Sequence, residues 1–262
     1  RYDYGREAFL EKVFEWKDQY QSRISNQMRR LGASFDFSRE AFTMDESRSA
    51  AVTENFCKLF EDGILYRENR LVNWCVYLNT TLSNLEVVQK TLPGRTLMNV
   101  PGYPPNERIE FGVIVSFVYP VVGSDEKIVV ATTRPETILG DTAVAVHPDD
   151  ERYKHLHGKM LQHPFIPERQ VPLVTDSIAV DMAFGTGAVK ITPAHDPNDY
   201  DVGKRHNLPF INILNDDGTL NANAGEFQGM KRFSARRAVV EALKAKGLYV
   251  ETKDNPMVVP VC

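Results

Sequence analysis

The chain has 262 residues, which is enough for one large domain or two modest ones. Hydrophobic residues make up 42% and charged residues 25%, as in an ordinary globular protein. The net charge of −4 argues against a histone-like basic binder, although a local basic groove is compatible with it. The three cysteines form no disulfide framework, and no apolar run approaches the roughly 20 residues of a membrane helix. We therefore expect a soluble protein in a reducing compartment.

Helices are predicted in the first part of the chain. Over residues 6–31, apolar residues recur on one helix face, and Gly32 is a plausible terminator. The face is formed by Phe9, Val13, Trp16, Tyr20, Ile24, Met28 and Leu31. Another helix is predicted from about residue 45 to 62, with Gly63 ending it. Residues 71–86 then indicate short strands and turns.

A segment rich in proline and glycine, residues 91–107, marks the predicted boundary to a second part. β-Branched and aromatic stretches then predict strands at 109–122, 127–133, 142–147, 171–175, 188–192 and 210–214. A late helix is predicted from Ser234, as N-cap, to Gly247. The predicted class is α+β. It comprises a flanking helical segment over 1–98, a mostly β, barrel-like domain over 99–255, and the start of a return connection over 256–262.

The sequences at two predicted strand ends have simple structural interpretations. In Thr132-Thr133-Arg134-Pro135-Glu136-Thr137, Pro135 could be the first residue of a short helix, with Glu136 in its first turn. Gly185-Thr186-Gly187 is a lone Gly-x-Gly without the remaining residues of a nucleotide-binding loop, which favours a tight turn.

The segment from Lys190 to Asp199 supports a structural and a functional interpretation. Asp196 is a plausible N-cap, Pro197 a good first helical residue, and Asp199 falls where a capping box has its acid. In the functional interpretation, this helix start presents two carboxylates beside a strand on which Lys190 and Thr192 share one face. Such a pocket would suit a substrate with an ammonium group and a small polar side chain.

The remaining candidate ligands give weaker signals. The histidines match no zinc-site spacing, so no metal is predicted and His195 is interpreted as a hydrogen-bonding or packing residue. Four basic residues cluster at the start of the late helix: Lys231, Arg232, Arg236 and Arg237. They could meet phosphate, but a solvated face is the default interpretation.

Together these segments resemble the valyl-tRNA synthetase family, which is part of the class I aminoacyl-tRNA synthetases. Val72-Asn73-Trp74-Cys75 and residues 82–87 resemble the junction between that family's catalytic core and its inserted editing (CP1) domain. Residues 131–141 and 184–200 resemble the two motif blocks of the editing site. The first block is shared by leucyl, isoleucyl and valyl relatives. The second is more specific, because Asp-Pro-Asn-Asp follows His195 where the leucyl pattern has Asp-Glu-Arg-Asp.

The resemblance implies a domain that hydrolyses threonyl-tRNA(Val), while the parent enzyme joins valine to tRNA using ATP and Mg. Asp199 would hold the substrate ammonium and Asp196 the threonine hydroxyl, with Lys190 and Thr192 lining the same pocket. The end of the tRNA would be contacted by Thr132, Thr133, Arg134, Phe184 and His195. Water would be positioned by Asp196, Lys190 or a ribose hydroxyl.

The ATP-binding signatures of the synthetic core are absent, so no cofactor and no valine activation are expected of this fragment. The implied partner is the threonine-charged acceptor end of tRNA(Val). We expect a cytoplasmic monomer with no membrane partner, and a mitochondrial form is compatible. Two alternatives stay open: an acceptor-end binding module without hydrolysis of its own, and the editing domain of an isoleucyl or leucyl relative.

Overall fold

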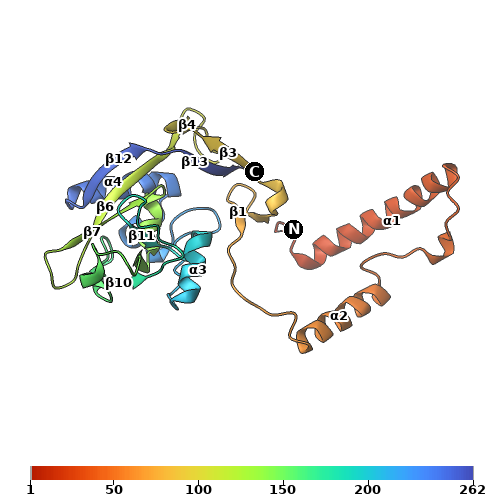
Figure 1. Ribbon diagram of the computed structural model, residues 1–262. Coiled ribbons are helices and arrows are strands. Elements are labelled where there is room, and N and C mark those ends of the chain that lie inside the picture. Colours follow the sequence, from red (N-terminus) through yellow and green to blue (C-terminus); the bar gives the residue numbers. More distant parts are fainter. Residues whose placement is uncertain (1, 262) are drawn as a thin grey trace. The chain divides into compact units, whose positions relative to one another are not determined.

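The computed structural model describes residues 2–261, and Arg1 and Cys262 lie outside the described residues. The described residues fall into two compact units, the first ending at Asn69 and the second beginning at Arg70 (Figure 1). The predicted domain limits at residues 98/99 and 255/256 stay predictions.

The first unit contains the helices predicted for it. They are α1 (Arg6–Arg30) and α2 (Glu46–Glu61), with a short 3-10 turn, η1 (Phe37–Arg39), between them. Gly32 follows α1 with a φ of 80°, as a helix terminator does. The Asp45 carboxylate caps α2 by accepting a hydrogen bond from the backbone N–H of Arg48 at 2.8 Å.

The larger sheets of the second unit differ in topology. In one, β6 (Val113–Pro120) lies between β7 (Lys127–Thr132) and β12 (Tyr249–Asp254), and both pairings are antiparallel. The other sheet has the strand order β11-β8-β10-β9, in which β8 and β10 are parallel. Its strands are β8 (Ala143–Val146), β9 (Met160–Gln162), β10 (Gln170–Thr175) and β11 (Ala188–Ile191).

Short strand pairs, helices and 3-10 turns complete the second unit. The pairs are β1 (Asn73–Cys75) with β2 (Thr80–Leu82), β3 (Val88–Leu92) with β13 (Met257–Val261), and β4 (Thr96–Met98) with β5 (Ile109–Phe111). The helices are α3 (Pro197–Arg205) and α4 (Arg232–Ala245). The 3-10 turns are η2 (Asn84–Glu86), η3 (Pro135–Gly140), η4 (Lys154–Leu156) and η5 (Ala222–Phe227).

A common hydrophobic core joins the sheets to α4. Phe117 of β6, Ile128 of β7, Leu139 of η3 and Val144 of β8 are all fully buried in one cluster. Helix α4 adds Ala235, Val239 and Leu243 to the same cluster. Because cores of this kind are close-packed, they hold the attached loops and strand ends in a fixed geometry. The polar site described below lies on such strand ends.

The α+β class is confirmed, and within the described residues the strands form separate sheets rather than one closed barrel. The predicted strand over 109–122 is divided at Gly112, which has a φ of 75°. A Cβ at Gly112 would lie 1.9 Å from the carbonyl oxygen of Gly94, so only glycine fits there. The division lets β5 pair with β4 while β6 pairs with β7.

Two local predictions are wrong. Residues 210–214 form no strand, and only Leu214 makes an isolated bridge, to Leu220. The backbone N–H of Ile213 instead donates to a histidine side chain, so it is not available to a strand ladder. Helix α4 begins at Arg232 with Lys231 as N-cap, three residues before the predicted cap. Gly247 follows the helix as predicted, with a φ of 66°.

Candidate active site

The strand that ends in Ile191 brings Lys190 and Thr192 to one side, as their spacing predicts. The Lys190 Nζ donates to the Thr192 Oγ1 and lies 3.0 Å from Oδ1 of Asp141. The Thr192 hydroxyl donates to the same Oδ1 at 2.5 Å. All three side chains are buried. The hydroxyl proton of Thr192 is thus directed at Asp141, and two of the three Lys190 donors are occupied.

Asp141 joins the site although its sequence position predicts no role for its side chain. It is fully buried, directly follows η3, and its Oδ2 accepts a hydrogen bond from the Tyr119 hydroxyl at 2.7 Å. Burial and the neighbouring Asp141 charge raise the pKa of Tyr119 well above its usual value, so the phenol stays a donor. The sequence places Asp141 as the last residue of the first motif block, 131–141.

The start of α3 carries the two predicted carboxylates. Asp196 is the N-cap, and its Oδ1 accepts from the backbone N–H groups of Asn198 (2.8 Å) and Asp199 (3.2 Å). Pro197 is the first helical residue, so the predicted helix start is confirmed. The Asp199 carboxylate does not turn back to the cap. Its Oδ2 accepts from the backbone N–H of Thr192 at 2.8 Å, which ties α3 to the end of β11.

The Asp199 carboxyl is electrostatically unusual. Burial raises its pKa to about 6, although the Lys190 charge and the hydrogen bond from Thr192 act in the opposite direction. The nearby carboxylates of Asp196 and Asp141 add to the increase. Asp199 therefore becomes an anion only as the pH approaches neutrality, and a cationic ligand would stabilise its charged form.

The first motif block meets the second through Arg134. Its Nη1 donates to the carbonyl oxygen of His195 at 2.6 Å, and its backbone N–H donates to the Thr132 Oγ1 at 3.1 Å. Thr132 is buried, whereas Thr133 is half-buried. The structure thus brings Arg134 to the residue that precedes Asp196, while Thr132 contacts the Arg134 backbone. Pro135 begins η3, so the predicted helical turn is confirmed.

His195 holds a neighbouring loop in place. Its Nε2 accepts from the backbone N–H of Ile213 at 3.1 Å. Burial, together with the positive charges of Arg134 and Lys190, lowers the His195 pKa to about 3, so the ring is neutral. This matches the predicted hydrogen-bonding and packing role, while a contact with the tRNA end stays a prediction.

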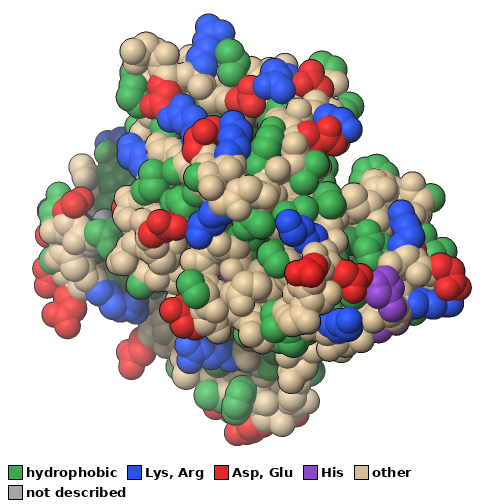
Figure 2. Space-filling view, turned by 90° about the vertical axis from the view of Figure 1, so that its left-hand side faces the viewer, with side chains coloured by type: hydrophobic (Ala, Val, Ile, Leu, Met, Phe, Trp, Pro, Cys, Tyr) green, Lys and Arg blue, Asp and Glu red, His purple; other side chains and the backbone are tan. Residues whose placement is uncertain are grey.

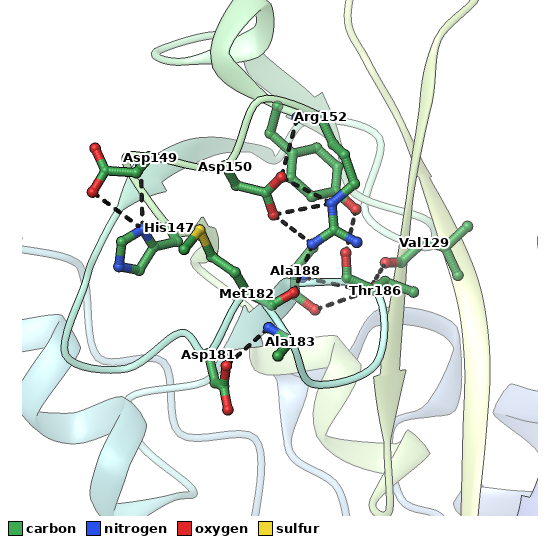
Figure 3. A network of polar contacts seen from close by, with 11 residues as sticks. Val129, His147, Asp149, Asp150, Arg152, Asp181, Met182, Ala183, Thr186 and Ala188 are labelled. Carbon is green, nitrogen blue, oxygen red and sulfur yellow. Dashed lines mark hydrogen bonds and ion pairs between the residues drawn. The ribbon is translucent and has the colours of Figure 1, made fainter.

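Hydrogen bonds and an ion pair fix the loop that contains Met182, Ala183 and Thr186 (Figure 3). Phe184 follows Ala183 in the same loop. Arg152 forms a forked ion pair with Asp150 and donates to the carbonyl oxygen of Met182 at 2.9 Å. The Thr186 Oγ1 donates to the carbonyl oxygen of Val129 at 2.7 Å. Phe184 itself is 73% exposed. The loop therefore presents an accessible aromatic ring, which could stack on a base.

Gly185-Thr186-Gly187 is the tight turn that its sequence predicts. Gly185 and Gly187 have positive φ values of 58° and 71°. A Cβ at Gly187 would lie 2.3 Å from Nη2 of Arg152, which shows how closely the guanidinium covers the turn.

The four basic residues around the start of α4 do not form one solvated face. Arg237 and Lys231 are exposed, but the Arg236 guanidinium makes two hydrogen bonds to the buried Glu136, at 2.7 and 2.8 Å. Burial raises the pKa of Glu136, but the charge and hydrogen bonds of Arg236 outweigh burial and lower the pKa to about 2. The default interpretation is therefore wrong for Arg236, and Arg232 is likewise largely covered.

Across the face drawn in Figure 2, acidic and basic side chains are interspersed. Within residues 2–261, no three His, Cys, Asp or Glu side chains are grouped as metal ligands. No helix in that range is both long and apolar enough to cross a membrane.

A family profile described as tRNA synthetases class I (I, L, M and V) matches residues 1–246. The chain belongs to this family. Over its whole length it is 66% identical to the valine–tRNA ligase of Schizosaccharomyces pombe and 56% identical to that of Homo sapiens. It is 64% identical to the mitochondrial valine–tRNA ligase of Saccharomyces cerevisiae. The predicted resemblance to valyl-tRNA synthetases is thus confirmed.

The chain spans about a quarter of the length of these relatives, 26% of the Schizosaccharomyces pombe protein and 21% of the human one. Among solved structures, one described as GlLeuRS-CP1 overlaps 55% of this chain and 100% of its own, with 13% identity and a TM-score of 0.43.

Proposed function

We propose that the second unit is an editing domain that hydrolyses threonyl-tRNA(Val), the mischarged product of a valine–tRNA ligase. One observation carries the proposal. Asp196 and Asp199 each use one carboxylate oxygen for structural hydrogen bonds, at Oδ1 and Oδ2 respectively. The other oxygen of each can accept from a substrate. A carboxylate pair of this kind suits the ammonium and the hydroxyl of threonine.

The two acids take different parts of threonine in this proposal. Asp199 pairs with the ammonium, because its buried carboxylate gains a compensating charge when the cation binds. Asp196 lies at the more open start of α3 and accepts from the threonine hydroxyl. Valine lacks that hydroxyl, and a polar group left unpaired on binding costs about 1–3 kcal/mol.

A second site is useful because the first cannot discriminate well. A hydrophobic pocket only weakly rejects an isostere that adds a hydroxyl. For a valyl enzyme, the known discrimination against threonine is about 10²-fold. An editing site that requires the hydroxyl hydrolyses threonyl-tRNA and leaves valyl-tRNA intact. The overall discrimination is then the product of the factors of the two sites.

The chemical step is hydrolysis of an ester. A water oxygen forms a bond to the threonyl carbonyl carbon and the bond from this carbon to the ribose oxygen breaks. One proton of the water passes to the ribose oxygen, so that free threonine and a tRNA with a free ribose hydroxyl leave. The third N–H of Lys190 can donate to the developing oxyanion, since its other donors are held by Asp141 and Thr192. Water is positioned by Asp196, Lys190 or a ribose hydroxyl. The tRNA end lies on Thr132, Thr133, Arg134, His195 and Phe184.

Deacylation of threonyl-tRNA(Val) and valyl-tRNA(Val) by the purified chain tests the proposal. We expect rapid loss of threonine and little loss of valine, without ATP, Mg or another cofactor. Asp199→Ala should abolish hydrolysis, and Asp196→Ala should reduce the preference for threonine. Asp201→Ala, an exposed acid on the same helix, is the matched control and should behave as the wild type.

Equal hydrolysis of both substrates would refute the specificity. Binding of tRNA without hydrolysis, at high protein concentration, would select the acceptor-end binding module instead. Clearance of valyl-tRNA(Ile) or of a mischarged leucine tRNA would select an isoleucyl or leucyl relative. We further propose a monomer, testable by light scattering, and a cytoplasmic or mitochondrial location, testable by imaging of the tagged parent protein.

A further inference from the structure

A cavity of about 180 Å³ lies at the start of α4, outside the proposed editing pocket. It is enclosed by the segment around Tyr77, the loop at residues 100–103, the turn at residues 217–218 and the first residues of α4. The residues with aromatic or charged side chains that line it are Tyr77, Tyr103, Asp217, Lys231 and Arg232. Aromatic and basic groups together are typical of surfaces that hold single-stranded nucleic acid.

Positive charge beside this cavity exceeds the local negative charge. The buried carboxylate of Glu136 has both oxygens engaged by Arg236. The Nε of Arg134 lies 3.8 Å from the same carboxylate, and the negative charge of this carboxylate also acts on Arg232. Three guanidinium groups thus share one carboxylate. One negative charge cannot neutralise three positive ones, so a net positive charge is left in this group.

Arg232 has a specific unsatisfied group. Its Nε is buried and has no hydrogen-bond partner within residues 2–261. Burial is the main cause that lowers the pKa of Arg232, and the charges of Arg134 and Arg236 add to the decrease. A buried donor without an acceptor is rare in native proteins. The Nε atom is closed to solvent, so an anion in the cavity would pair with the part of the Arg232 side chain that lines it and would compensate its positive charge.

Lys231 and the helix start add to the attraction for an anion. The Lys231 Nζ lies 5.2 Å from the centre of the Tyr103 ring and donates to the carbonyl oxygen of Gly102 at 2.8 Å. Lys231 is the N-cap of α4 and offers no side-chain cap, so the positive end of the helix dipole faces the same side. The opposing acid, Asp217, already accepts from the backbone N–H and the hydroxyl of Thr219.

We propose that this cavity binds a phosphate group, with the Arg232 guanidinium and the Lys231 ammonium as its ligands and Tyr77 beside the attached nucleoside. This proposal rests on the proposed function, because the phosphate is assigned to the acceptor strand of the tRNA. Arg134, assigned to the terminal adenosine, and Arg232 both act on Glu136. A strand whose last nucleotide lies on Arg134 therefore has an earlier phosphate within reach of Arg232.

The test compares Arg232→Gln with Arg237→Gln on the same helix, where Arg237 pairs with Glu107 at the surface. Binding of uncharged tRNA(Val) is measured by fluorescence anisotropy over a series of salt concentrations, so the readout does not require hydrolysis. Loss of one phosphate contact to a single strand should lower the slope of log affinity against log salt by about 0.7. We expect this change, with about fivefold weaker binding at low salt, in Arg232→Gln alone.

An unchanged salt slope in a folded Arg232→Gln would overturn the proposal. Should that variant fail to fold, Lys231→Gln replaces it, with the same slope change expected and the same result contradicting it. Inorganic phosphate and AMP, titrated while tyrosine resonances are followed, separate the sources. Saturation by phosphate combined with unchanged tRNA slopes would assign the cavity to a free anion and overturn the tRNA source. Absence of deacylation with altered slopes would refute the editing function alone.

Discussion

Helices α1 and α4 have similar apolar patterns but different surroundings. In α4, Phe233, Ala235, Val239 and Leu243 are buried, because strands of the second unit pack against them. In α1 the only buried residue described is Ser25, and Trp16 on its apolar face is 60% exposed. Helical periodicity therefore predicts which side of a helix is apolar, but not whether the chain itself covers that side. The second unit has its own core, whereas the first presents open apolar faces.

The largest expected effect is the loss of a core side chain in the second unit. Phe117→Ala removes a fully buried ring from β6 and should lower the free energy of unfolding by about 3–5 kcal/mol. Trp16→Ala removes a larger but mostly exposed ring and should change it by less than about 1 kcal/mol. Urea denaturation followed by circular dichroism measures both. Comparable losses would show that the contrast between the units is wrong.

The buried charges of the site should have an effect of similar size. Asp141→Asn leaves the Lys190 ammonium buried without its counterion, and breaking such a pair typically costs about 3–5 kcal/mol. Hydrolysis should slow as well, since Lys190 and Thr192 lose their common acceptor. Tyr119→Phe removes only one hydrogen bond to Asp141 and should cost about 1 kcal/mol. A stable, fully active Asp141→Asn would contradict the positioning role of Asp141.

The titration of Asp199 gives a smaller effect with a defined sign. Folding raises its pKa from 3.8 to about 6, so the native state binds this proton more tightly than the unfolded state does. Protonation of Asp199 therefore stabilises the native state. That stabilisation is complete below pH 4 and is lost as the pH rises through 6, by at most about 3 kcal/mol. Asp199→Asn should therefore be more stable than the wild type above pH 6, as measured by denaturation between pH 5 and 8. Equal pH profiles would contradict the raised pKa.

Glu136 has the opposite dependence and must be separated from Asp199. Its pKa is lowered from 4.5 to about 2, so its contribution is present above pH 4.5 and is lost on acidification toward pH 2. Measurements restricted to pH 5–8 avoid this second transition.

Loss of an exposed ion pair should have the smallest effect on stability, and this effect should be equally small in both units. Lys58 pairs with Glu54 on α2, and Lys244 pairs with Glu241 on α4, in both cases between exposed side chains. Surface pairs contribute little because water screens them. Lys58→Ala and Lys244→Ala should leave the denaturation midpoint unchanged within error. A clear shift in only one of them would mean that surface charge also distinguishes the units.

Much of the site could be predicted because its local rules are strong. An aspartate before a proline predicts the start of α3, and alternation along a strand places Lys190 with Thr192. Asp141 could not be predicted as their partner, because it lies 49 residues before Lys190 and meets it only through the pairing of β8 with β11. Likewise, no local signal shows that Gly112 must accommodate Gly94.

The antiparallel pairing of β3 with β13 has a consequence for a longer protein. Leu92 lies opposite Met257, so the path into and the path out of the intervening residues run side by side, about 4.8 Å apart. In a longer chain that contains this segment, the residues that precede it and the residues that follow it can therefore lie next to each other. Such a junction has the geometry of a hairpin turn, and exchange of residues 93–256 for a short turn would leave the longer chain's two ends at the junction where they were.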